Sequence, residues 1–163
     1  MSMAVVYTDL DGTLLDHYTY AFNEALETIK SLKARGVPIV PCTSKTRAET
    51  VKLMQDLELE GPMIVENGAA IWVPDDWGLT KPEGADEDVD ARAWSHCFGP
   101  ARGMIRRQLA ILNIEWGNRY QSLCEISDKQ VMALTGLDAA SAARAKDRHY
   151  CETLVWLGTP ADR

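Results

Sequence analysis

The sequence contains few cysteines, and none of them is spaced like a zinc ligand. The four cysteines are Cys42, Cys97, Cys124 and Cys151, and no Cys-x-x-Cys motif occurs. Structural zinc sites usually need such pairs, so this spacing argues against zinc. It also indicates no disulfide framework, and we therefore expect a reduced protein in the cytoplasm.

Long apolar runs and clusters of basic residues are also missing. No segment approaches the ~18 consecutive apolar residues of a membrane-spanning helix, and residues 1–4 lack the features of a signal peptide. The 163 residues include 17 Lys and Arg against 24 Asp and Glu, which gives a net charge of −7. We therefore expect no membrane partner and no nucleic-acid partner.

The first 78 residues alternate between short apolar runs and segments of helical periodicity. Strands are predicted at 5–7, 37–40 and 63–74, the last with a turn at Asn67-Gly68, and helices at 22–35 and 47–57. The connections are too long for hairpins, so this order favours a parallel sheet with right-handed crossovers. We therefore predict an α/β fold.

The composition changes towards Pro, Gly and acidic residues, and residues 79–90 are predicted to be a linker between domains at 1–78 and 91–163. The second domain is predicted to be α/β as well. Its strands are expected at 91–98, 119–123 and 152–157, and its helices at 100–113, 127–137 and 138–150. Ser127 or Asp128 is expected to cap the second of these helices, and Asp138 the third.

Polar side chains follow each of the first three predicted strands. They are Asp9 and Asp11, Thr43 and Ser44, and Glu66 and Asn67. Ligand sites of parallel sheets lie beyond the carboxyl ends of the strands, where these residues fall. The sequence therefore predicts one polar site at this edge of the sheet.

The two aspartates suit phosphoryl transfer. An ionised carboxylate at Asp9 can attack a phosphate ester, and Mg²⁺ would screen the repulsion between the two anions. Asp11 can protonate the leaving group and later take a proton from water. The Gly12-Thr13 turn can offer backbone N–H groups to the phosphate.

The second strand exit adds two groups of the same kind. Thr43 can donate its hydroxyl to the phosphate, and Lys45 can add a positive charge. The alternative is an ordinary turn and helix cap, because Asp and Gly are common in loops. A calcium-binding EF-hand loop starting at Asp9 is excluded, because Leu14 and Tyr20 replace the Gly and Glu that it needs.

Several segments resemble known motifs. DLDGTLLD, at residues 9–16, resembles the first motif of the haloacid dehalogenase-like (HAD) superfamily, and Thr43 matches the second. Asp11 is the acid that phosphatases and phosphomutases of this superfamily carry. The segments VPCTSKTRAE, IVENGAAIWVP, LTGL and AKDRHYCETLVW resemble mannosyl-3-phosphoglycerate phosphatases, in the large-cap (IIB) branch.

This resemblance implies part of a Rossmann-like parallel-sheet core and part of an α/β cap. It implies that Asp9 is the nucleophile and a Mg²⁺ ligand, and that Asp11 is the acid/base and binds the metal through its carbonyl. The expected phosphate- and substrate-binding residues are Gly12, Thr13, Thr43, Ser44, Lys45, Asn67, Arg148 and Glu152. Arg148 and Glu152 would contact a sugar or glycerate, or else mark only a helix end before a strand.

The resemblance is incomplete, because the family's phosphate-binding lysine and its acidic GDxxND-type motif have no match here. We therefore expect a truncated Mg²⁺-dependent phosphatase of a small sugar-glycerate phosphate, with weak or no activity alone. Its first strand, at 4–8, would be an exposed edge and favour self-association. The alternatives are a non-catalytic binding or oligomeric module, and a phosphatase or phosphomutase for another sugar phosphate.

Overall fold

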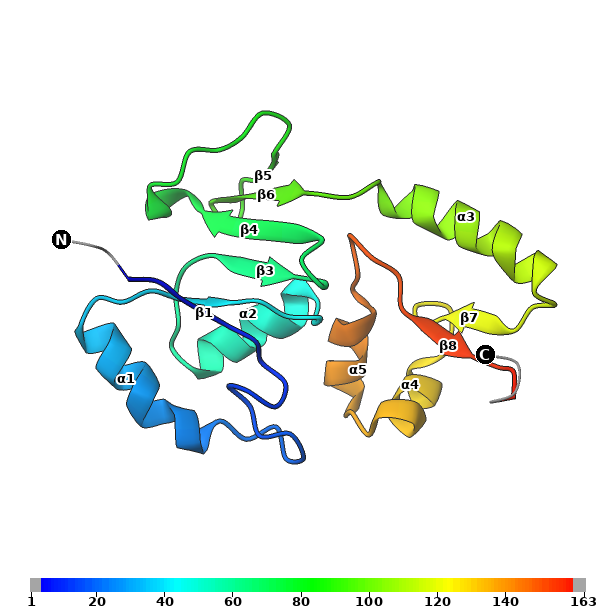
Figure 1. Cartoon of the computed structure of the whole chain (residues 1–163), viewed down its shortest axis with the longest axis horizontal. Helices are drawn as coiled ribbons and strands as arrows, with labels where there is room; N and C mark the ends of the chain where they lie inside the picture. The colour runs from blue at the N-terminus through cyan, green and yellow to red at the C-terminus, as the bar shows by residue number, and fades with distance from the viewer. Residues whose placement is uncertain (1–3, 160–163) are drawn as a thin grey trace. The chain divides into compact units, whose positions relative to one another are not determined.

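The computed structural model describes residues 4–159, so residues 1–3 and 160–163 of the two predicted domains lie outside the described part. The chain forms two compact units, Met1–Phe98 and Gly99–Arg163, which are coloured blue to green and green to red in Figure 1. The division lies later than the linker predicted at 79–90. Both units combine helices and strands, which confirms the α/β class.

The first unit begins with alternating strands and helices. These are β1 (Val6–Thr8), η1 (Asn23–Ala25), α1 (Leu26–Ala34), β2 (Ile39–Pro41), α2 (Arg47–Asp56) and β3 (Met63–Val65). β1 and β2 are parallel, with Val6 opposite Ile39. A parallel bridge between Cys42 and Ile64 joins β2 to β3. The three strands therefore end at one edge of the sheet, as the sequence predicted.

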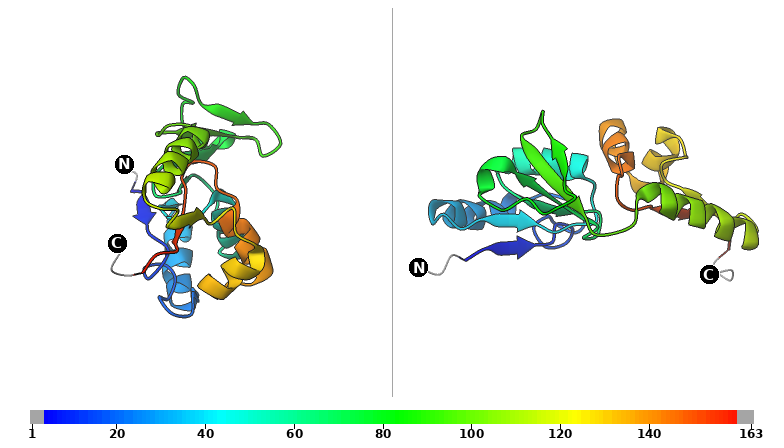
Figure 2. Two further views of the ribbon diagram at one scale, coloured as in Figure 1. Left: turned by 90° about the vertical axis from the view of Figure 1, so that its right-hand side faces the viewer. Right: turned by 90° about the horizontal axis from the view of Figure 1, so that it is seen from above.

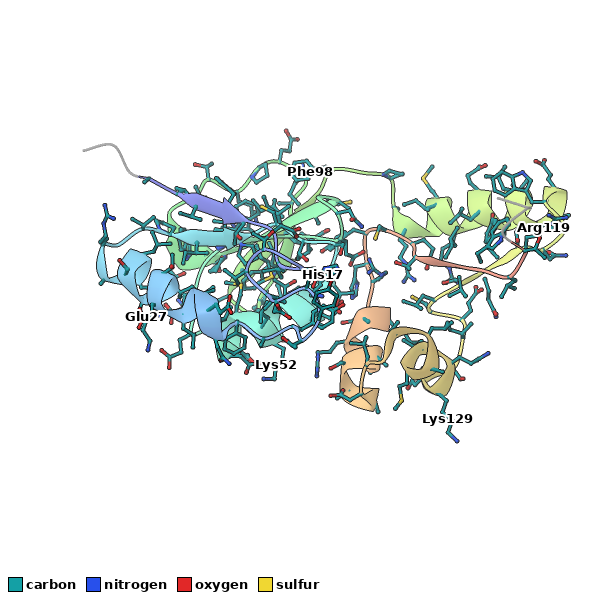
Figure 3. The ribbon with its side chains drawn as sticks, turned by 60° about the horizontal axis from the view of Figure 1, so that its bottom comes forward. His17, Glu27, Lys52, Phe98, Arg119 and Lys129 are labelled. Atoms are coloured by element: carbon teal, nitrogen blue, oxygen red, sulfur yellow. The ribbon has the colours of Figure 1, made fainter. Side chains whose placement is uncertain are left out.

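The helices of this unit pack through a few apolar residues and keep their charged side chains outside. Ile29 on α1 and Met54 on α2 are buried, whereas Glu27 and Lys52 point outward in Figure 3. α2 begins with a capping box, in which Glu49 N–H donates to Oγ1 of Thr46 and Thr46 N–H donates to Oε2 of Glu49. This cap fixes the start of α2 directly after residues 43–45.

The sheet continues beyond β3 with antiparallel strands. These are β4 (Ala70–Pro74), β5 (Asp86–Asp88) and β6 (Ala93–Cys97), with η2 (Asp75–Trp77) after β4. The order is β3-β4-β6-β5, and buried Val73 lies opposite buried Trp94. The predicted strand at 63–74 is thus two strands, and part of the predicted linker is β5. Its acidic side chains suit a sheet edge as well as a linker, so composition alone did not separate the two.

β1 is an edge strand among the strands that the structure describes. It pairs only with β2 and runs along the outside of the first unit in the right-hand view of Figure 2. Val5 is 40% exposed and Tyr7 is 65% exposed beside and within it. The first unit therefore has an open apolar edge at β1, and the charged strand β5 forms its opposite edge.

The second unit is smaller. Its elements are α3 (Arg102–Glu115), β7 (Tyr120–Ser122), α4 (Asp128–Thr135), α5 (Ala139–Lys146) and β8 (Leu154–Trp156). β7 and β8 are antiparallel, and a core of Leu123, Ile126, Val131 and Ala142 lies within the unit. Ser127 caps α4 and Asp138 caps α5, as predicted. Over residues 4–159, no helix has the length and apolar composition that a membrane crossing requires.

Candidate active site

A pocket of about 450 Å³ lies where the three parallel strands end. Its walls include five of the predicted site residues, Asp9, Asp11, Thr43, Ser44 and Asn67, together with Cys42, Ile64 and Gly68. These residues come from three separate strand exits that are joined by β1–β2 pairing and the Cys42–Ile64 bridge. The structure therefore brings the core of the predicted site together.

Asp9 is held in place by its own loop. The N–H of Leu10 donates to Oδ1 of Asp9 over 2.7 Å, and the Leu10 side chain is fully buried. The Thr8 hydroxyl donates to the backbone carbonyl of Asp9 over 2.7 Å. The anchored Leu10 fixes one carboxylate oxygen of Asp9 at the pocket wall.

Asp11 and Lys45 form an ion pair. Nζ of Lys45 lies 2.8 Å from Oδ1 of Asp11, and the two side chains are 21% and 34% exposed. Nζ also lies 5.4 Å from the centre of the Tyr20 ring. The ammonium of Lys45 is thus placed between a carboxylate and an aromatic face, which are both favourable surroundings for a cation.

Thr43 is the buried member of the site. It is 4% exposed, and its Oγ1 accepts a hydrogen bond from Lys45 N–H over 3.1 Å. Its own N–H donates to the carbonyl of Ile64 over 3.0 Å, and its carbonyl accepts from Asn67 N–H over 2.9 Å. The exits of β2 and β3 are therefore tied together at Thr43.

The turn between β3 and β4 holds two residues in the left-handed region. Glu66 has φ 51° and Asn67 has φ 63°, and Gly68 N–H donates to the carbonyl of Val65 over 3.1 Å. A non-glycine residue held there costs of order 1–3 kcal/mol and occurs often at functional sites. Glu66 is also fully buried, and it is one of the polar residues expected where the third strand ends.

Gly12 and Thr13 lie differently from the expectation. The N–H of Gly12 donates to the carbonyl of Leu15 over 2.9 Å, and that of Thr13 donates to the carbonyl of Leu10 over 3.2 Å. Both residues line a neighbouring cavity of about 780 Å³, which also borders β1 and α1. Because Gly12 has φ 76°, the loop closes on itself and uses these donors internally.

The surroundings of Cys42 in the pocket affect the pKa of its thiol. Burial, and then the negative charge of Asp9, raise the pKa of the Cys42 thiol above its usual range. The thiol therefore stays protonated near neutral pH and is a poor nucleophile. Asp9 is the stronger candidate for attack in this pocket.

Few metal ligands are available. Within residues 4–159, no three His, Cys, Asp or Glu side chains are grouped so that they could hold a metal ion. Asp9 and Asp11 nevertheless line one pocket and offer carboxylate and carbonyl oxygens. Mg²⁺ prefers oxygen donors and often uses only one or two carboxylates with water and phosphate, so these residues fit Mg²⁺ in kind.

Arg148 and Glu152 lie in the second unit, between α5 and β8. The side chain of Glu152 is 2% exposed. Its Oε1 accepts from the Ser122 hydroxyl over 2.7 Å, and its Oε2 accepts from Nε of Arg102 over 3.2 Å. Nη1 of Arg102 also donates to the carbonyl of Arg148 over 2.6 Å. The sequence reasoning missed Arg102, because it lies 50 residues from Glu152 in the chain.

The comparisons with known proteins agree with these motifs. Residues 6–90, more than half of the chain, match the model of the haloacid dehalogenase-like hydrolases. A protein from Methanococcoides burtonii named glucosyl-3-phosphoglycerate/mannosyl-3-phosphoglycerate phosphatase is 36% identical over 91% of this chain and 54% of its own length. A protein of the same name from Persephonella marina is 47% identical over 43% of this chain and 26% of its own length.

Solved structures show the same fold. A protein from Thermotoga maritima matches 99% of this chain and 58% of its own, with a TM-score of 0.58 and 15% identity. A HAD superfamily phosphatase from Bacteroides thetaiotaomicron matches 84% of this chain and 48% of its own, with a TM-score of 0.55 and 16% identity. The chain spans about half the length of its Methanococcoides relative. It belongs to the haloacid dehalogenase-like hydrolases.

Proposed function

We propose that this chain carries the nucleophile and the proton donor of a phosphatase acting on a mannosyl-3-phosphoglycerate-like substrate. The observation that supports the proposal most is the meeting of Asp9, Asp11 and Thr43 in one pocket. The substrate class rests on the names of the two relatives, both glucosyl-3-phosphoglycerate/mannosyl-3-phosphoglycerate phosphatases. The first unit would be part of the catalytic core, and the second part of the cap.

Asp9 would act as the nucleophile. Its Oδ1 accepts the Leu10 N–H, so we assign the attack on phosphorus to Oδ2. A bond forms between Oδ2 and phosphorus while the ester P–O bond breaks, which leaves an aspartyl-phosphate and an alcohol. Attack by water on phosphorus then releases phosphate and restores the carboxylate of Asp9.

Asp11 would move the protons of both steps. In its protonated form it gives a proton to the departing alkoxide in the first step. As the carboxylate paired with Lys45 it then takes a proton from the attacking water in the second step, which restores its starting form. Lys45, whose Nζ is 2.8 Å from Oδ1 of Asp11, adds a positive charge next to the phosphate. This charge favours the binding of a dianionic ester.

The remaining residues would hold the phosphate. Thr43 Oγ1 accepts from Lys45 N–H, which leaves its own hydroxyl hydrogen for a phosphate oxygen. Ser44 and Asn67 are exposed in the pocket wall and can donate from the opposite strand exits. Gly12 and Thr13 can contribute N–H groups only if the loop gives up its internal hydrogen bonds to Leu15 and Leu10.

The carboxylate of Asp9 and the carbonyl of Asp11 are the groups that would hold Mg²⁺. When bound, the ion would screen the repulsion between Asp9 and the phosphate. Because the described residues offer no larger acidic cluster, we propose that this chain binds Mg²⁺ weakly and turns over slowly alone. Arg148 would contact the sugar or glycerate, and Glu152 would hold Arg102, whose Nη1 donates to the carbonyl of Arg148.

Two other functions have some support. The exposed edge β1 favours a non-catalytic module that associates with another copy of itself through this strand. The motif residues alone also suit a phosphatase or phosphomutase for another sugar phosphate. Under the main proposal, the protein acts on a small molecule in the cytoplasm.

Trapping of the covalent intermediate tests the proposal. The chain is mixed with mannosyl-3-phosphoglycerate and Mg²⁺, quenched with acid, and digested for mass spectrometry. One phosphoryl group is expected on the peptide that contains Asp9, and none is expected in Asp9→Asn. Phosphate release should stay well below the ordinary turnover of about 1–10 s⁻¹. A phosphoryl group on another residue would contradict the proposed mechanism, and ordinary turnover would contradict the expected weak activity.

A further inference from the structure

A closed turn at residues 16–21, which we call the 16–21 turn, follows the loop that carries Asp9 and Asp11. Oδ1 of Asp16 accepts hydrogen bonds from Tyr18 N–H, Thr19 N–H and the Thr19 hydroxyl over 3.0, 2.7 and 2.8 Å. Asp16 N–H donates to the carbonyl of Ala21, and Tyr20 N–H donates to that of Asp16. His17, labelled in Figure 3, belongs to this turn. These bonds give the turn one defined shape.

That shape places Tyr20 in an unfavourable backbone conformation. Tyr20 has φ 55°, which is uncommon for a bulky residue and costs of order 1–3 kcal/mol. Its side chain is 56% exposed, so burial of the ring explains little of this cost. An observed strained residue of this kind is a reason to look for a function.

The Tyr20 ring is placed beside Lys45, which is the ion-pair partner of Asp11. It lies 5.4 Å from Nζ of Lys45, and that Nζ lies 2.8 Å from Oδ1 of Asp11. Tyr20 is thus connected to the pocket through Lys45. Tyr18 lies in the same turn and is 87% exposed, with His17 as the partner of its ring.

The in-line geometry of the displacement determines which part of the substrate lies near Tyr20. In an in-line displacement the leaving oxygen lies opposite the attacking oxygen of Asp9, and the group that protonates it, Asp11, must lie next to it. The organic part of the ester is therefore on the side of Asp11. Lys45 and Tyr20 are the groups that continue the site from Asp11.

We infer that Tyr20 is a specificity residue that contacts the organic leaving group of the substrate. This inference rests on the proposed function and adds the position of the leaving group to it. The exposed ring offers a flat apolar face to the C–H groups of a sugar or glycerate, and Lys45 beside it offers positive charge to the glycerate carboxylate. The ligand class is a polar alcohol that combines C–H faces with a carboxylate.

The test uses the products, so that it does not depend on turnover. The full chain, labelled with ¹⁵N and with ¹³C in its tyrosine rings, is titrated by NMR with inorganic phosphate, and then with mannosylglycerate in the presence of phosphate. Phosphate should shift the amides of Asp11, Thr43 and Ser44. Mannosylglycerate should shift the ring signals of Tyr20 and leave those of Tyr18 unchanged.

The matched variants separate the ring from the fold. Tyr20→Asn removes the ring and keeps a residue that tolerates a left-handed backbone, Tyr20→Phe keeps the ring, and Tyr18→Asn is the control in the same turn. Tyr20→Asn should weaken mannosylglycerate binding about tenfold and change phosphate binding less than about twofold. Tyr20→Phe and Tyr18→Asn should bind both ligands as the unchanged chain does.

The outcomes are distinguishable. If phosphate shifts no residue of the pocket, the proposed function fails, and this inference fails with it. If phosphate binds in the pocket but mannosylglycerate leaves the Tyr20 ring unshifted, only this inference is overturned. Equal mannosylglycerate affinity of Tyr20→Asn and Tyr18→Asn would overturn it as well.

Discussion

One ion pair in each unit allows a comparison: Lys45 with Asp11 in the first, and Arg102 with Glu152 in the second. The two pairs differ in how much room for a ligand lies beside them. In the first unit, Lys45 meets Asp11 at the wall of a pocket of about 450 Å³, and both side chains are partly exposed. In the second unit, the side chain of Glu152 is 2% exposed, and both of its oxygens accept hydrogen bonds from Arg102 or Ser122. Asp11 of the first pair lines the larger pocket, whereas Glu152 of the second pair lines a cavity of only about 110 Å³ and has both oxygens hydrogen-bonded. Motif residues alone do not distinguish these two situations.

Asp9→Asn should break the first unit's chemistry and leave its fold intact. An amide cannot replace the attacking carboxylate, so phosphoenzyme formation should fall on the order of 10³-fold or more. Asp9 is exposed, so the free energy of unfolding should change by less than about 0.5 kcal/mol. Rapid-quench mass spectrometry and urea unfolding measure the two effects. Unchanged phosphoenzyme formation would remove Asp9 from the role of nucleophile.

Glu152→Gln should have its main effect on stability. The substitution leaves the charged guanidinium of Arg102 beside a neutral amide in a partly buried site. The free energy of unfolding should therefore fall by about 3 kcal/mol. Glu125→Gln is the matched control, because Glu125 is 49% exposed in its pair with Arg106 and should cost less than about 0.5 kcal/mol. Urea unfolding followed by the tryptophan signal measures both. Equal effects of the two variants would show that burial of Glu152 contributes little.

The two capping boxes allow a finer comparison, because one lies in each unit. Thr46→Ala and Ser127→Ala each remove a side-chain cap and should each cost about 1 kcal/mol. Thr46 directly follows Lys45, so loosening the start of α2 should also weaken phosphate binding. Ser127→Ala should leave phosphate binding unchanged. Calorimetric titration with phosphate checks this, and equal phosphate affinities of the two variants would separate the cap of α2 from the site.

The smallest effect concerns pH. Hydrogen bonds from the backbone and hydroxyl of Thr19 hold the pKa of Asp16 below its ordinary 3.8, and bonds from Ser141 lower the pKa of Asp138 in the same way. A lowered folded-state pKa contributes stability above pH 3.8 that is lost as the pH falls through the lowered value. Asp16→Asn and Asp138→Asn should each reduce this loss, as thermal unfolding between about pH 5 and pH 2 would show. An unchanged pH profile would contradict the assignment.

The sequence predicted the elements well wherever local signals were strong. Ser127 and Asp138 begin helices as expected, and the strand exits at Asp9, Thr43 and Asn67 meet as expected. These features depend on caps, apolar periodicity and the rule that parallel strands end together. Each can be read from a few neighbouring residues.

The parts that differed depend on contacts between distant residues. The burial of Glu152 follows from Arg102, 50 residues away, and the strand β5 is defined by its pairing with β6 rather than by its acidic composition. The internal hydrogen bonds of Gly12 and Thr13 follow from how the loop closes. Motif spacing does not report such pairing, which is set by the three-dimensional packing.

The strands of the first unit end in two different edges, and this difference bears on how copies of the chain could associate through them. The bridge between Cys42 and Ile64 links the strands from β1 to β5 into one order, with the apolar residues Val5 and Tyr7 at one edge and charged β5 at the other. Pairing of two copies through β1 would satisfy the open backbone groups of both. In the first unit only the charged β5 edges would then face outward, so this sheet would not extend beyond the symmetric pair.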